Sequence, residues 1–209
     1  MRTEIGLVLA CALACSAQQW EIGAAAGYGA YRDGTIFSPA GKARAGVRNR
    51  FAVSALMGED MYAHMGGEVR YTYQDGDPFL SARGIKTNIE GQSHSFHYDA
   101  LFHLRGRHEK IRPYVAAGIG VKVYVVSGPP NPRPPLGDIA VLTTHDQARP
   151  LVTGGGGVKL KLGHNVLLRL DFRDYITPFP KELIAPAPFN TARGFFHQFT
   201  PLIGISYVP

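Results

Sequence analysis

Cysteine is nearly absent from the 209-residue chain, whose two cysteines, Cys11 and Cys15, both lie in the N-terminal stretch MRTEIGLVLACALACSAQQW. This stretch has a basic residue near its start, then an apolar run, then small residues. The pattern is typical of a signal peptide over residues 1–17, with cleavage after Ala17. The mature chain, residues 18–209, would then contain no cysteine, which excludes disulfides and thiol chemistry.

Two other interpretations of the N-terminus remain open. The tetrapeptide ALAC ending at Cys15 resembles a lipobox and would make Cys15 a lipidation site, although Ala12 stands where such motifs usually have leucine. The stretch could also form a buried N-terminal helix of a cytosolic protein.

The sequence also lacks any later run of about 20 apolar residues, which is the length that a transmembrane helix needs. Its mean hydropathy of −0.07 does not exclude a membrane barrel, because the wall of such a barrel alternates apolar and polar residues. The chain is basic, with 22 Lys and Arg against 16 Asp and Glu. Such a surplus suits nucleic acid or anionic lipid, and export of the chain argues against nucleic acid as a partner.

Alternation of apolar and polar residues is what the mature chain has in abundance. In RPYVAAGIGVKVYVV (112–126), Val115, Ile119 and Val123 share one face, whereas Gly118 and Lys122 lie on the other. A period of two over such a length predicts a β-strand with one apolar face. Eight segments have this pattern, and they span residues 19–31, 42–57, 63–73, 95–105, 112–126, 151–162, 166–175 and 197–207.

The connections between these segments alternate in length. Three are short (GED, GRHEK and GHN), and four are long, comprising residues 32–41, 74–91, 127–148 and 177–194. An even number of strands joined by alternating short and long turns behind a signal peptide is the pattern of an outer-membrane barrel. We therefore predict one domain over residues 18–209, an all-β, eight-stranded antiparallel up-and-down transmembrane β-barrel with short turns in the periplasm and long loops outside.

A soluble lipocalin-like barrel has the same strand number with the opposite orientation of its faces. The charged residues do not decide between the two, but the glycines do, because glycines on the charged face make room inside a narrow lumen. Aromatic residues on the apolar face lie near strand ends, as in the two interfacial girdles of membrane barrels. They are Trp20, Tyr28, Tyr71, Tyr73, Phe172, Phe199 and Tyr207.

Three stretches, WEIGAAAGYGAY, RPYVAAGIGVKVY and GGGGVKLKLGHNVLLRLDFRDY, resemble the small bacterial outer-membrane β-barrel family, which includes the OmpA-type transmembrane domain. The resemblance covers residues 19–208. It implies a location in the bacterial outer membrane, contact with its lipid, and assembly by the barrel assembly machinery. In one respect the chain departs from the family, because Tyr207, the expected terminal aromatic residue, is followed by Val208 and Pro209.

The charged residues on the polar face predict a lumen that is filled by ion pairs, because an eight-stranded barrel is only wide enough for side chains. An alternative is a small anion-preferring pore, since basic residues outnumber acidic ones on this face. The predicted network comprises Glu21, Arg44, Arg48, Arg50, Glu68, Arg70, Asp99, Lys122, Lys159, Lys161, Arg169, Asp171 and Arg173, and Lys42 shares its face.

No catalytic, metal or cofactor site is expected. Ser95, His97 and Asp99 share one strand face and suggest a lipid-A-modifying enzyme, but such neighbours are about 7 Å apart, beyond hydrogen-bond reach. We therefore expect a structural or adhesive barrel without enzymatic activity, whose loops contact an unknown extracellular partner. Basic residues near the outer rim could also contact lipopolysaccharide phosphates, namely Arg32, Lys42 and Arg193.

Overall fold

The structure is a computed structural model that describes residues 19–39, 41–129 and 131–209. The predicted signal peptide, including Cys11 and Cys15, lies outside the described residues. Within the described ranges, no helix has both the length and the apolar character to cross a membrane.

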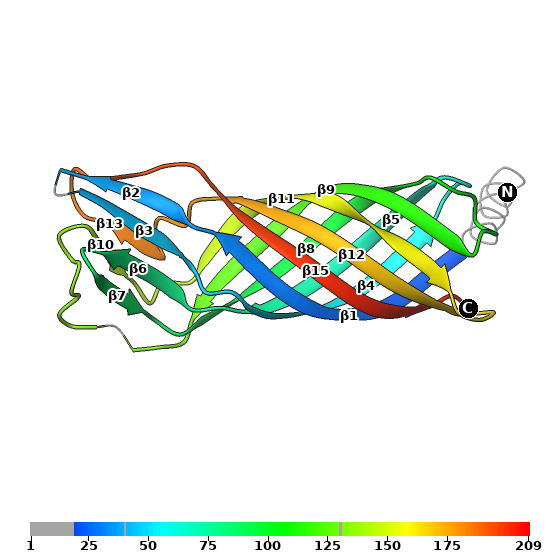
Figure 1. The fold of residues 1–209 in the computed structure, drawn as a ribbon, viewed down its shortest axis with the longest axis horizontal. Helices are drawn as coiled ribbons and strands as arrows, with labels where there is room; N and C mark the ends of the chain where they lie inside the picture. The colour runs from blue at the N-terminus through cyan, green and yellow to red at the C-terminus, as the bar shows by residue number, and fades with distance from the viewer. Residues whose placement is uncertain (1–18, 40, 130) are drawn as a thin grey trace, which may run out of the picture.

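Eight strands form a closed antiparallel barrel in the order β1-β15-β12-β11-β9-β8-β5-β4 (Figure 1). Each strand pairs with its neighbour in the chain, and β1 pairs with β15 to close the cylinder. The predicted fold is thus confirmed. The barrel strands are β1 (Gln19–Arg32), β4 (Arg50–Asp60), β5 (Met65–Asp75), β8 (Gly91–His103), β9 (Ile111–Val126), β11 (Gln147–Lys161), β12 (Val166–Pro178) and β15 (Phe195–Tyr207).

The barrel has its apolar residues outside and its charged residues inside. Ile119 is 72% exposed and Ile205 is 59% exposed, whereas Arg70 and Asp99 are 0% exposed. A soluble barrel has the reverse arrangement, because water stabilises charges on its outer face and apolar side chains fill its interior. The lipocalin-like alternative is therefore wrong.

Two glycines of β9 allow this strand to lie close to β8. A Cβ atom on Gly118 would overlap the carbonyl oxygen of Tyr98 and the carboxylate of Asp99, and one on Gly120 would overlap the carbonyl oxygen of Phe96. The small residues on the polar face therefore make room for an interior charge, as predicted, and also for the neighbouring backbone.

At one end of the barrel, the four long connections fold together into an ordered structure that we call the head (residues 33–39, 41–49, 76–90, 127–129, 131–146 and 179–194), on the left in Figure 1. It contains a five-stranded sheet in the order β14-β2-β3-β6-β7 and a separate pair, β10-β13. Its strands are β2 (Gly34–Ser38), β3 (Gly41–Val47), β6 (Pro78–Ala82), β7 (Ile85–Asn88), β10 (Ala140–Leu142), β13 (Ile184–Pro186) and β14 (Thr191–Ala192).

The head has its own hydrophobic core, which continues onto the ends of the barrel strands. Residues from all four connections and from β1, β9 and β15 contribute to it, so the loops hold one another in place. The buried members are Tyr31, Ile36, Ala43, Ala45, Val47, Leu80, Ala82, Tyr124, Leu136, Ile139, Ala140, Phe179, Leu183, Ile184, Ala192 and Phe196.

The prediction of one continuous strand over residues 42–57 is wrong. The chain leaves the strand conformation at Arg48 and Asn49, where the Arg48 amide donates to the carbonyl of Asp77 and the Asn49 side chain accepts from the amide of Tyr31. These bonds divide the segment into β3 of the head and β4 of the barrel, so the apolar face of β3 packs into the head core and does not face lipid.

Candidate functional site

The middle of the lumen is occupied by a fully buried ion-pair network. Glu68 of β5 lies 2.7 Å from guanidinium nitrogens of both Arg70 and Arg169, and Arg70 lies 2.6 Å from Asp171 of β12. Arg173 is 3.3 Å from Asp99 of β8. The pairs link strands from opposite walls, and every member is at most 5% exposed, so the charges neutralise one another where water does not reach.

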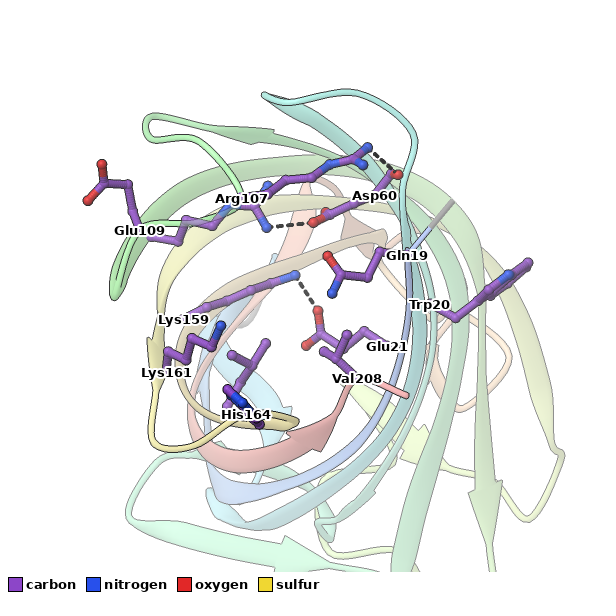
Figure 2. Close-up of a pocket in the computed structure, with 12 residues that line it drawn as sticks. Gln19, Trp20, Glu21, Asp60, Arg107, Glu109, Lys159, Lys161, His164 and Val208 are labelled. Atoms are coloured by element: carbon purple, nitrogen blue, oxygen red, sulfur yellow. Dashed lines mark hydrogen bonds and ion pairs between the residues drawn. The ribbon is translucent and has the colours of Figure 1, made fainter. Parts of the chain in front are cut away.

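A second set of ion pairs lies toward the end of the barrel that carries the short turns (Figure 2). Glu21 is 2.5 Å from Lys159 and 2.7 Å from Arg169, which joins this set to the central network. Asp60 pairs with Arg112 at 2.6 Å. These pairs border the pocket at this end of the lumen, which is also lined by Arg107, Lys161 and His164.

The sequence interpretation missed Asp60 and Arg112. Asp60 was assigned to a short turn, but β4 continues to this residue. Arg112 shares its strand face with Lys122, so the alternation in β9 was a signal that could have identified it.

Lys122 is the predicted network member that differs most in its environment. It is 1% exposed, and within the described chain it has no carboxylate partner. Its ammonium donates to the hydroxyl of Tyr31 at 2.8 Å and to the side-chain oxygen of Gln198. It also lies 4.8 Å from the ring centroid of Tyr31 and 5.2 Å from that of Tyr124, so aromatic faces take the place of a counter-ion.

The structure places four of the predicted lumen residues elsewhere. Arg44, in β3, is exposed and pairs with Asp33 in the head. Arg48 and Arg50 are partly exposed at the junction of head and barrel. They lie there because the strand interruption at residues 48–49 lifts this segment out of the lumen, and both pair with Asp77. Lys161 is exposed at the short-turn end, one strand period beyond Lys159.

The charge balance of the lumen is consequently close to even. Five buried carboxylates face six buried cations: Glu21, Asp60, Glu68, Asp99 and Asp171 against Arg70, Arg112, Lys122, Lys159, Arg169 and Arg173. The excess of basic residues in the sequence lies mostly on the head and the turns. The lumen therefore has a surplus of one positive charge, and Lys122 is the cation without a carboxylate partner among the described residues; the larger surplus that suggested an anion-preferring pore is absent from these residues.

The Ser95, His97 and Asp99 side chains all lie buried in the lumen. His97 Nδ1 is 3.0 Å from Asp99 Oδ1, so the expectation that they are too far apart to bond is wrong for this pair; their side chains lean toward each other along the strand. The other ring nitrogen, Nε2, is buried without a hydrogen-bond partner among the described residues, and Ser95 does not reach it. The pair thus lacks an attached nucleophile.

Residues 19–39, 41–129 and 131–209 contain no group of three His, Cys, Asp or Glu side chains arranged to hold an ion.

Comparison with known proteins finds no matching family model and no matching curated protein. Solved structures do match over nearly the whole chain. The outer membrane protein OprG from Pseudomonas aeruginosa has a TM-score of 0.58 at 11% identity, with 90% of this chain and 95% of that chain covered. The outer membrane protein AlkL, solved in lipid bilayers, has a TM-score of 0.52 at 15% sequence identity. The match covers 91% of this chain and 90% of AlkL. Neisserial surface protein A has a TM-score of 0.51 at 13% sequence identity. The match covers 90% of this chain and 96% of that protein.

At these identities the similarity concerns the fold. It agrees with the two observations already made on the barrel, namely its apolar outer band and its charged interior. Together they show that the chain has the fold of the small bacterial outer-membrane β-barrels.

Proposed function

We propose that the protein is a non-conducting outer-membrane anchor that presents its head outside the cell as a rigid binding surface, in an adhesive or structural role. The observation that carries this proposal is the single hydrophobic core that unites the four long connections with the barrel strands. Loops that served only as connections would need no shared core. A preorganised surface loses less entropy when it binds a partner, which favours a recognition role.

A transport role is less well supported. Buried ion pairs and the buried Lys122 side chain, which bonds to Tyr31 and Gln198, fill the lumen, and the head core lies beyond Lys122. A solute would have to separate buried pairs such as Glu68 and Arg70, which is costly in a medium of low dielectric constant.

An aromatic and basic patch on the head is the best candidate for the binding surface. Phe189 is 97% exposed and has a φ of +70°, a conformation that is unfavourable for an aromatic residue. It lies two residues before β14, and in β14 Thr191 pairs with Phe37, which is 51% exposed. Lys42 lies 5.5 Å from the Phe37 ring centroid. Exposed aromatic residues beside a cation are typical of binding hot spots.

Adhesion assays with the displayed protein test this proposal. Bacteria that do not otherwise adhere would express the wild type, a Phe37→Ser/Phe189→Ser variant, or an Ile85→Ser control, and would be tested on host-cell layers and on extracellular-matrix coatings. Ile85 is a matched control because it is an exposed apolar residue elsewhere on the head. We expect wild-type and control cells to adhere and the double variant to lose most of its adhesion. Equal adhesion by all three strains would reject the patch as the binding surface, and no adhesion by the wild type would reject the adhesive role.

The remaining expectations stand as part of the same proposal. We propose no enzymatic activity, because the Nε2 of His97 has no hydrogen-bond partner, and hence no nucleophile, within the described part of the chain. The partners we propose for the barrel are outer-membrane lipid, lipopolysaccharide and the barrel assembly machinery. A specific relationship to the OmpA-type domain remains a hypothesis that rests on the sequence resemblance.

A further inference from the structure

A groove at the base of the head is lined by three basic side chains. Arg149 comes from the start of β11, Lys181 follows the end of β12, and Arg193 follows β14. Between them lie Phe179 and Ala192, which are buried members of the head core. We call this site the basic groove. Because its floor belongs to the core, the three cations are held around a fixed surface.

The three cations lack the carboxylate partners that the central arginines of the lumen have. The central arginines all pair with carboxylates, whereas in the described part of the chain Arg149, Lys181 and Arg193 form no ion pair. Glu182, the neighbouring acidic residue, does not line the groove. Arg149 Nε is buried and has no hydrogen-bond partner among the described atoms. A buried N–H donor without an acceptor costs free energy, and an anion bound by the partly exposed Arg149 side chain would supply an acceptor for its guanidinium.

The rim of the groove is also fixed by the backbone. The Phe179 amide donates to the carbonyl of Gly194 at 3.2 Å, and Gly194 has a φ of +106°, which a residue with a side chain would rarely adopt. This bond closes the segment between β12 and β15 next to Arg193. The groove is therefore a preformed concave site.

The groove lies at the head end of the apolar outer face of the barrel. On the outer face of β12 and β15, the stacked Phe172 and Phe199 are followed by the Asp174–His197 pair, whose atoms are 2.8 Å apart. Pro178, which lines the groove, is four residues beyond Asp174, or about 13 Å along the strand. The interfacial layer of a membrane is about 5–8 Å deep on each side, so the groove lies at the outer boundary of this layer or beyond it, on the side of the head.

We propose that the basic groove binds a phosphate monoester, with Arg149, Lys181 and Arg193 as its ligands. Three unpaired cations on one concave surface favour an anion with two charges and several acceptor oxygens, which is the chemistry of a phosphate group. Its source would be a phosphate of lipopolysaccharide or a phosphorylated molecule that is free in solution. This inference does not depend on an adhesive role for the head.

Calorimetric titration of the folded protein in detergent tests the site. The probes are native lipopolysaccharide, lipopolysaccharide dephosphorylated with a phosphatase, and inorganic phosphate. We expect native lipopolysaccharide or inorganic phosphate to bind the wild type. An Arg149→Gln/Lys181→Gln/Arg193→Gln variant should bind at least about tenfold more weakly. Binding to native but not to dephosphorylated lipopolysaccharide would identify the lipid source, and binding to inorganic phosphate alone would identify a soluble one.

A matched control carries three exposed cations that lie outside the groove and form no ion pair in the described residues: Arg105→Gln/Lys110→Gln/Arg133→Gln. It should bind like the wild type. Equal weakening in both triple variants would indicate a general charge effect and would overturn the site, as would wild-type affinity in the groove variant or no binding by the wild type. If the groove variant does not fold, the single Arg193→Gln change, at an exposed position, provides the comparison.

Discussion

Glu68 is the residue on which the central network depends most. Its carboxylate lies 2.7 Å from nitrogens of Arg70 and Arg169 and 3.5 Å from Arg173, and its side chain is 0% exposed. The Glu68→Gln substitution keeps the shape but removes the charge. The three arginines are then left with Asp99, Asp171 and Glu21, and Arg169 shares Glu21 with Lys159. Breaking a buried pair in this way typically costs about 3–5 kcal/mol. Total stabilities are about 5–15 kcal/mol, so the loss would be a large part of the free energy of unfolding.

Urea unfolding in lipid vesicles measures this loss. The chain has one tryptophan, Trp20, on the outer face of β1, so its fluorescence reports the transfer from lipid to water. The control is Glu109→Gln, because Glu109 is exposed on a short turn and should change stability by less than about 0.5 kcal/mol. If Glu68→Gln unfolded with the same midpoint as this control, the network would not stabilise the barrel as described.

Three further outcomes are expected. Gly118→Ala should prevent folding, judged by the loss of heat-modifiable gel migration, because the new Cβ would overlap the Tyr98 carbonyl; Gly154→Ala, with open space around its Cα, should fold normally. Lys122→Met should be neutral or stabilising in urea unfolding, because a buried charge without a carboxylate partner is replaced by an apolar side chain of similar volume; a loss above about 2 kcal/mol would contradict this. Planar-bilayer recordings of the wild type should show no conductance steps, and regular single-channel steps would disprove the closed lumen.

The barrel could be predicted from sequence because its determinants are local. Each wall strand repeats with a period of two, so residues such as Val115 and Lys122 reveal their faces without knowledge of their neighbours. The members of the central network follow in the same way. The distinction between a membrane and a soluble barrel required a further argument, from the positions of glycine and aromatic residues, and the exposed apolar exterior confirms it.

The head could not be predicted in this way, because its core is assembled from segments that are far apart in the chain. Leu136 and Leu183 are buried in it, but they come from connections without any regular period. The same limit explains why the sequence wrongly predicts Arg44 in the lumen. The alternating pattern of β3 continues that of β4, although β3 belongs to another sheet. The contact between His97 and Asp99 was missed for a different reason, because strand spacing fixes Cα positions and not the direction in which side chains lean.

The most direct test of the central claim, a transmembrane barrel with its head outside the cell, is labelling of single introduced cysteines in intact cells with a membrane-impermeant maleimide. The described residues contain no cysteine, so each label reports one site. Phe189→Cys, on the head, should react in intact cells, whereas Lys110→Cys, on a short turn, should react only after permeabilisation. Reaction of Lys110→Cys in intact cells together with protection of Phe189→Cys would contradict the proposed orientation.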